Sequence, residues 1–246
     1  MKAMIFAAGY GIRLQPLTNT LPKALVPING KPMLQHIMEK LIASQINDFV
    51  VNVHHFPGQI IDFLKSKNNF GANISISDES EQLLDTGGGL KNASGLLEGD
   101  EPILLYNVDV LSNINLHKLL QFHEKNKALA TLVTRKRETQ RYLMFSNDNV
   151  LTGWRNLKTK KEKISIPELY KTSRPFAFSG IHIVSPEFII NMPGTGKFSI
   201  IETYLEVAKT QKIMGYIDSS KLWIDIGKPG QLAEAEKLIQ AYPLSS

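Results

Sequence analysis

Cysteine is absent from the 246 residues of the chain. Disulfide bonds, thiolate zinc sites and cysteine nucleophiles are therefore excluded, and any metal ion must be held by carboxylates, histidines or substrate oxygens. Long apolar runs are also lacking, and the first eight residues enter a strand-like segment without the layout of a signal peptide. These absences predict a soluble, cytoplasmic protein with no membrane partner.

A large excess of one charge is lacking as well, since the formal net charge is only +5. A mildly cationic surface attracts phosphate of any origin. The charge alone therefore does not indicate whether the ligand is a small polyanion or nucleic acid. The motifs described below favour the small molecule and no nucleic acid. No segment has linker composition and no repeat is present. We therefore expect one domain over residues 1–246, with halves at 1–135 and 136–246.

Apolar runs of strand length alternate with stretches of helical period, as in strand-helix-strand units around a mostly parallel sheet. The expected strands are 4–8, 49–53, 74–76, 102–107, 130–133, 142–145, 150–154, 176–184, 213–217 and 222–225. The expected helices are 32–44, 58–64, 91–97, 116–123, 198–209 and a closing helix after residue 230. This pattern predicts an α/β protein with a Rossmann-like mixed sheet, and a small β extension after residue 135 that forms one wall of a cleft.

A glycine-containing loop follows the first strand. Its backbone from Ala7 and Ala8 through Gly9 and Gly11 allows N–H groups to approach phosphate oxygens without hindrance from a Cβ. Leu14 stands where a dinucleotide fingerprint needs its third glycine, and no Gly-Lys-Ser/Thr follows as in a P-loop. The loop therefore disfavours a dinucleotide oxidoreductase and indicates another kind of phosphate site.

Two basic residues accompany this loop. Arg13 lies on it and Lys23 lies just after it, in a stretch rich in glycine and proline. Arginine offers a planar fork of donors and lysine a mobile point charge. The pair suits a triphosphate, whose negative charge increases toward the pyrophosphate leaving group.

Two aspartates end apolar runs. Asp109 lies at the end of the strand expected at 102–107, at the sheet edge where α/β folds bind ligands, and Asp225 ends a short apolar run before Gly227. Magnesium prefers a few carboxylates together with phosphate oxygens and water. The two aspartates are therefore candidate metal ligands.

The loop 78–90 contains three consecutive glycines at the start of a helix, which indicates that a bulky or flat group lies against the backbone. Carboxylates such as Glu79 or Glu81 can accept from guanine N–H groups, whereas Gln82 offers uracil one donor and one acceptor. The nucleobase remains open between these alternatives.

The string G-Y-G-I-R-L-Q-P-L-T at 9–18, followed by P-K-A-L-V-P at 22–27, resembles the signature of the sugar-1-phosphate nucleotidyltransferase family. The string D-T-G-G-G-L at 85–90 is most similar to that of bacterial N-acetylmuramate-1-phosphate uridylyltransferases, and mannose-1-phosphate guanylyltransferases are similar members. A W-x-D-x-G segment at 223–227 also resembles the family. The likeness covers nearly the whole chain.

The resemblance implies that Arg13, Lys23 and Asp109 are catalytic and that Asp109 and Asp225 share a Mg²⁺ ion. It implies that Lys23 holds the triphosphate with Arg13 and also reaches the sugar phosphate. It further implies a nucleotide-binding half, 1–135, and a sugar-binding half, 136–246. The implied nucleotide site is Ala7, Ala8, Gly9, Gly11, Glu79, Gln82, Thr86, Gly87 and Asn107, and the implied sugar site is Gly180 and Glu202.

The chain departs from the family pattern at two places. Val108 stands where the family has a glycine before the first aspartate. Better-known members carry a glutamate-lysine pair for the sugar phosphate, whereas the segment 152–165 looks like a solvated basic run with lysines at 158, 160, 161 and 163. The residue that contacts the sugar phosphate besides Lys23 is therefore not fixed by the sequence.

These features predict a nucleotidyltransferase that moves a nucleoside monophosphate, from UTP or GTP by preference, onto a sugar 1-phosphate to make a cell-wall or polysaccharide precursor. One alternative is a choline-phosphate cytidylyltransferase of the same fold. Another is a catalytically idle regulatory subunit that binds nucleotide-sugars, against which the four residues Arg13, Lys23, Asp109 and Asp225 argue together. The sugar and the oligomeric state are not readable, so a homo-oligomer remains open.

Overall fold

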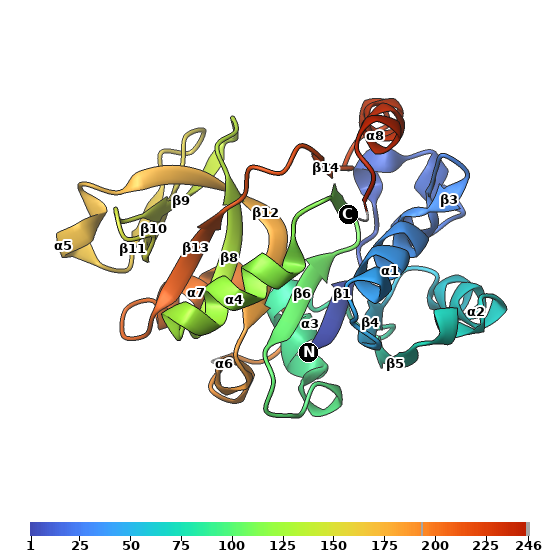
Figure 1. Ribbon diagram of the computed structural model, residues 1–246, viewed down its shortest axis with the longest axis horizontal. Coiled ribbons are helices and arrows are strands. Elements are labelled where there is room, and N and C mark those ends of the chain that lie inside the picture. The colour runs from blue at the N-terminus through green and yellow to red at the C-terminus, as the bar shows by residue number, and fades with distance from the viewer. Residues whose placement is uncertain (193, 245–246) are drawn as a thin grey trace.

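The computed structural model describes residues 1–192 and 194–244. One twisted sheet runs through the molecule with helices on both sides, α4 (Leu116–Asn126) in front and α3 (Asp85–Asn92) behind (Figure 1). The strands of this sheet are β1 (Lys2–Phe6), β4 (Asp48–Val53), β5 (Asn73–Asp78), β6 (Ile103–Asn107), β8 (Ala130–Arg135), β9 (Arg141–Phe145), β10 (Leu151–Asn156), β11 (Glu162–Ile164), β12 (Arg174–Val184) and β13 (Ile213–Ile217).

The sheet has a parallel part and an antiparallel part. β1 pairs in parallel with β4 and β6, and β4 pairs in parallel with β5. β12 runs antiparallel to β6, β8 and β9. Beyond β9, the strands β10 and β11 continue the sheet in antiparallel order, and β13 pairs in parallel with β8. The predicted mixed α/β sheet is confirmed. The strand expected at 130–133 pairs with β12 and β13, so it lies on the side of the antiparallel extension.

Helices cover both faces because their apolar stripes pack on the alternate residues of the strands. One core cluster joins the sheet to α1 (Met33–Ala43), α2 (Pro57–Ser66), α4 and α8 (Gly230–Ala241). The other joins it to α3, α6 (Pro186–Ile190) and α7 (Ile200–Val207). A short helix, α5 (Pro167–Tyr170), lies next to β10. No helix in the described residues is both long and apolar enough to cross a membrane.

Two small ribbons complete the fold. β2 (Pro27–Ile28) and β3 (Lys31–Pro32) form a hairpin, and β7 (Val110–Ser112) pairs with β14 (Trp223–Asp225). In the second ribbon Asp225 is the partner of Val110, the residue after Asp109. The chain's last strand is thereby brought to the carboxyl end of β6.

The helix expected at 91–97 is shifted in the structure, where α3 begins at Asp85 and ends at Asn92, and a 3-10 turn follows at Ser94–Leu96. The shift has a packing cause. The helix's glycines are buried against the segment before α7, where the N–H groups of Gly87 and Gly88 donate to the Phe198 carbonyl at 2.9 and 3.2 Å. The expectation was therefore wrong by about one and a half turns, because tertiary contacts place glycines inside this helix.

Two buried histidines make stability sensitive to acid. Burial lowers the pKa of His182 to about 3 and that of His123 to about 4. The unfolded chain binds protons near pH 6.5, whereas the folded chain does not until much lower pH. The free energy of unfolding should therefore be intact above pH 6.5, and fall below it by about 1.4 kcal/mol per pH unit for each histidine.

Urea unfolding at pH 7 and pH 5 tests this, with His182→Gln as the variant and His117→Gln, at an exposed position, as the control. The loss of stability between the two pH values should be smaller in His182→Gln than in wild type and unchanged in the control. An equal loss in all three proteins would show that His182 does not contribute.

Candidate active site

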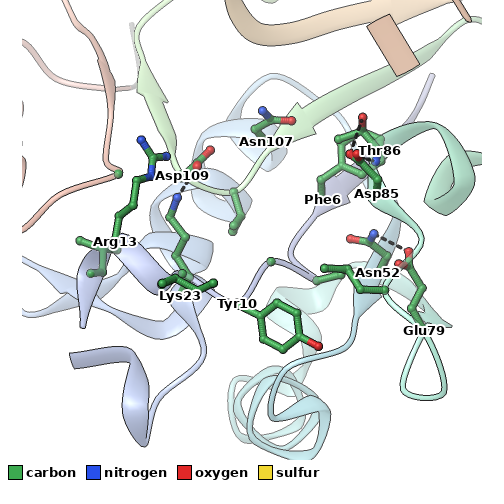
Figure 2. A pocket seen from close by; sticks show the side chains of 18 of the residues that line it. Phe6, Tyr10, Arg13, Lys23, Asn52, Glu79, Asp85, Thr86, Asn107 and Asp109 are labelled. Atoms are coloured by element: carbon green, nitrogen blue, oxygen red, sulfur yellow. Dashed lines mark hydrogen bonds and ion pairs between the residues drawn. The ribbon is translucent and has the colours of Figure 1, made fainter. Parts of the chain in front are cut away.

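A cavity of about 530 Å³ lies at the carboxyl ends of the parallel strands. In Figure 2, Arg13, Lys23 and Asp109 gather at one end of it and Asn52, Glu79, Asp85 and Thr86 at the other. The cavity is lined by Phe6, Ala8, Gly9, Tyr10, Gly11, Ile12, Arg13, Leu14, Lys23, Asn52, Glu79, Leu83, Asp85, Thr86, Asn107, Val108, Asp109, Lys197 and Gly227. This is the edge at which open α/β sheets bind ligands.

The glycine-containing loop forms one wall of the cavity. Gly11 has φ +65°, and a Cβ there would lie 2.9 Å from Cγ2 of Thr18 and 3.0 Å from Cβ of Lys23. Only glycine fits this position, because both the backbone angle and the space exclude a side chain. Ala7 lies outside the cavity lining, and its N–H donates to Oδ1 of Asn52 at 2.7 Å.

The predicted basic pair lies at the floor of the cavity. Arg13 is in the 3-10 turn Ile12–Leu14, and Lys23 is the first residue of a later 3-10 turn, Lys23–Leu25. Lys23 is buried, with only 8% of its surface exposed, and its Nζ forms an ion pair with Asp109. The two cations and Asp109 therefore meet in one place, although they come from distant parts of the sequence.

The second aspartate joins this group through the β7–β14 ribbon. The N–H of Ile226 donates to the carbonyl of Asp109 at 2.8 Å, which holds the Asp225 segment beside Asp109. Oδ1 of Asp225 is buried and has no hydrogen-bond partner among the described residues. Burial and the negative charge of Asp109 raise the pKa of Asp225, while Lys23 and Arg13 act in the opposite direction.

This pair of carboxylates fits a divalent cation. An unpaired, buried carboxylate oxygen costs free energy unless a cation or donor satisfies it. Asp109 and Asp225, with phosphate oxygens and water, make up the kind of ligand set that Mg²⁺ prefers. The residues therefore fit the metal ion that the sequence predicts.

At the far end of the cavity, Glu79 has a structural role. It is 3% exposed; its Oε1 accepts from Nδ2 of Asn52 at 2.7 Å and its Oε2 from the N–H of Leu84 at 3.0 Å. The carboxylate is therefore occupied in holding the loop after β5. Gln82 is exposed and outside the cavity lining.

The start of α3 contributes a different surface from the one expected. Thr86 and Asp85 line the cavity, whereas Gly87 does not, and its N–H is already donated to Phe198. Oγ1 of Thr86 accepts from the N–H of Ile200 at 3.1 Å. The loop before α7 thus fixes this end of the cavity.

Asn52 and Tyr10 are among the lining residues that the sequence did not single out. Asn52 connects Ala7 to Glu79, and the signal was present, since Asn52 is the one amide in the apolar strand β4. Tyr10 packs edge-on against His54 at a centroid distance of 5.0 Å, with its OH 2.8 Å from Nε2. His54 therefore supports an aromatic lining residue.

The expected sugar-side residues lie outside the cavity lining. Gly180, on β12, has φ +74°, and a Cβ there would lie 2.8 Å from Val110 and 3.0 Å from Nδ2 of Asn107. It therefore adjoins Asn107, which does line the cavity. Glu202, on α7, is exposed and forms an ion pair with Lys163 on β11.

The segment 152–165 does contain an adjacent glutamate and lysine, Glu162 and Lys163. Both are exposed in β11, and lysines 158, 160 and 161 are exposed too. The interpretation of this stretch as a solvated run is confirmed.

The fold and cavity together define an α/β protein with a candidate ligand site at the carboxyl edge of its sheet. A model of the nucleotidyl transferase family matches residues 2–241. The chain belongs to this family, and the predicted resemblance is confirmed.

Two relatives align with nearly the whole of this chain. The chain is 31% identical to N-acetylmuramate alpha-1-phosphate uridylyltransferase of Caulobacter vibrioides, over 97% of both proteins. It is 34% identical to mannose-1-phosphate guanyltransferase of Yarrowia lipolytica, over 93% of this chain but only 61% of that protein.

Solved structures share the fold. A UDP-glucose pyrophosphorylase complexed with UDP-glucose superposes with a TM-score of 0.75 at 20% identity, over 98% of each chain. HddC from Yersinia pseudotuberculosis complexed with GMP-PN superposes with a TM-score of 0.74 at 22% identity, over 96% of this chain and 98% of that one. At these identities the likeness establishes the fold alone.

Proposed function

We propose that this protein is a sugar-1-phosphate nucleotidyltransferase. It transfers a nucleoside monophosphate from a nucleoside triphosphate, UTP or GTP by preference, to a sugar 1-phosphate and releases pyrophosphate. The observation that carries this proposal is the meeting of Arg13, Lys23 and Asp109 at one end of a nucleotide-sized cavity, with Asp225 held beside Asp109 just outside the cavity lining. We place the reaction in the cytoplasm, where nucleoside triphosphates are available.

The chemistry is an in-line displacement. A phosphate oxygen of the sugar 1-phosphate, already ionised at neutral pH, forms a bond to the α-phosphorus as the bond to the β-phosphate bridging oxygen breaks and pyrophosphate leaves. No general base is needed. Arg13 and Lys23 neutralise charge on the triphosphate, and the backbone of the glycine-containing loop positions it, so that catalysis comes from alignment and electrostatics.

Asp109 and Asp225 would hold Mg²⁺ in this protein. When bound, the ion supplies positive charge to the phosphate oxygens around the reacting phosphorus. Lys23 is paired with Asp109. The lysine is therefore kept at the floor of the cavity, where it can reach phosphate oxygens.

The choice of substrates is supported by the relatives. The uridylyltransferase of Caulobacter is matched over 97% of its length and acts, by its name, on N-acetylmuramate 1-phosphate. Guanyltransferases acting on mannose 1-phosphate are similar over the same part of the chain. UTP with an N-acetylated sugar 1-phosphate, and GTP with mannose 1-phosphate, are the first pairs to test.

Pyrophosphate release from UTP, GTP, CTP and dTTP, each with several sugar 1-phosphates and with choline phosphate, tests the proposal. Turnover with a sugar 1-phosphate is expected, and the triphosphate used should raise Tm because a ligand of the native state stabilises it. Turnover with CTP and choline phosphate alone would identify the cytidylyltransferase. Binding of nucleotide-sugars without turnover in any pair would identify a regulatory subunit.

Gly227→Ala should weaken triphosphate binding. A Cβ at this position would lie 2.6 Å from Nη2 and 2.7 Å from Cζ of Arg13, so the guanidinium must move away from the cavity floor. We expect KM for the triphosphate to rise about tenfold, as for the loss of one charge-assisted hydrogen bond. Steady-state pyrophosphate release measures this. Gly230→Ala is the matched control, because a Cβ there meets nothing within 4 Å; equal KM values in both variants would contradict the role of Arg13.

A further inference from the structure

A second arginine lies beside Asp225 on the side of the antiparallel extension. Arg137 follows β8, and its guanidinium stacks over the ring of Trp223 at 4.6 Å from the centroid. Its Nη2 donates to the carbonyl of Phe178 at 3.1 Å. Trp223 lies two residues before Asp225 and therefore on the same face of β14, and Phe178 lies two residues before Gly180. Arg137 thus joins the metal-site strand to the expected sugar-side strand.

The guanidinium of Arg137 has no carboxylate partner at ion-pair distance among residues 1–192 and 194–244. Its Nε is buried and makes no hydrogen bond within those residues. The neighbouring Arg135 is different, since it pairs with Asp218 and donates to Ser220. A half-buried cation with unused donors is costly, and such groups are found where an anion binds.

The position of Arg137 indicates which anion this is. Trp223, Asp225 and Gly227 follow one another along one segment, which spans at most about 13 Å between its ends. Arg137 lies against Trp223 at one end, and Arg13 lies against Gly227 at the other. The two arginines therefore flank Asp225, whose carboxylate feels the charge of both. Two phosphate-bearing substrates must meet at this aspartate, and Arg13 belongs to the loop that serves the triphosphate.

We propose that Arg137 binds the phosphate of the sugar 1-phosphate. The inference rests on the proposed function and supplies the sugar-side cation that the exposed lysines of residues 158–163 do not provide. The planar guanidinium can donate two parallel hydrogen bonds to phosphate oxygens. Stacking on Trp223 fixes its plane before the substrate arrives, which lowers the entropy lost on binding.

The test is the steady-state kinetics of Arg137→Gln and Arg137→Lys with the substrate pair that the wild type uses. In Arg137→Gln, KM for the sugar 1-phosphate should rise about ten- to a hundredfold, as for the loss of a hydrogen bond between charged groups. KM for the triphosphate should stay within about twofold. Arg137→Lys keeps the positive charge but loses the planar set of donors. Its KM for the sugar 1-phosphate should therefore lie between that of the wild type and that of Arg137→Gln.

Arg174→Gln is the control, because Arg174 also stacks on an aromatic ring, that of Phe176, and bonds to backbone carbonyls, but is exposed and far along β12 from Gly180. Its kinetics should match the wild type. An unchanged KM for the sugar 1-phosphate in Arg137→Gln, or an equal rise in both KM values, overturns the proposal and leaves the proposed function standing. A wild type without turnover in any pair refutes both.

Discussion

Asp109→Asn is expected to lower the rate of pyrophosphate release at least about a thousandfold while the protein stays folded. The amide keeps the shape of the side chain and removes the charge that the proposed Mg²⁺ site requires. Charge stabilisation by a metal site contributes several kcal/mol to the transition state, and each 1.36 kcal/mol corresponds to a factor of ten in rate. The variant also leaves the buried Lys23 without its ion-pair partner, so Tm should fall.

The measurement is single-turnover and steady-state pyrophosphate release, with circular dichroism and thermal unfolding as checks of the fold. Asp148→Asn is the matched control, since Asp148 is exposed and makes no ion pair within the described part of the chain. The control should be as active as the wild type. Normal turnover of Asp109→Asn would remove Asp109 from the site and with it the basis of the proposed reaction.

The parts of the fold with clear periodicity could be predicted from the sequence. Leu34, Ile37 and Leu41 repeat at helical spacing, and all three are buried on the predicted helix α1. Asp109 could be placed because a residue that ends a parallel strand must lie at the carboxyl edge of the sheet. Its neighbour Asp225 required the family resemblance as well, since three residues of strand carry little signal by themselves.

The missing parts depend on contacts between distant segments. The sequence identifies Glu79 as a carboxylate in a loop, but β4 pairs with β5 so that Asn52 reaches it and occupies its oxygen. Arg137 lies in a polar stretch of sequence, and its contacts with the Trp223 ring and the Phe178 carbonyl distinguish it from its neighbours. The positions of these side chains depend on strand register and on packing between distant segments, and a local sequence pattern predicts neither.

Asp225→Asn is expected to abolish turnover, by about a thousandfold or more, and to raise the Tm of the metal-free protein. The activity is lost for the same reason as in Asp109→Asn. The gain in stability follows from the surroundings of the carboxyl group, because burial and the charge of Asp109 raise the pKa of Asp225. A pKa that is raised in the folded state means that folding disfavours the ionised carboxylate. At neutral pH the ionised Asp225 therefore lowers the free energy of unfolding, and asparagine removes that penalty.

Thermal unfolding at pH 7 in EDTA, and again with Mg²⁺ and the triphosphate, separates the two effects. The variant should have the higher Tm in EDTA, and the wild type should gain more from Mg²⁺ with the triphosphate, because only the wild type keeps both carboxylates. In EDTA, Asp109→Asn should lower Tm relative to the wild type, whereas Asp225→Asn should raise it. The reason is that Asp109 is paired with Lys23, whereas Oδ1 of Asp225 has no partner in the described residues. A lower Tm for Asp225→Asn in EDTA would mean that Lys23, Arg13 and Arg137 together stabilise the charged form more than burial and Asp109 destabilise it.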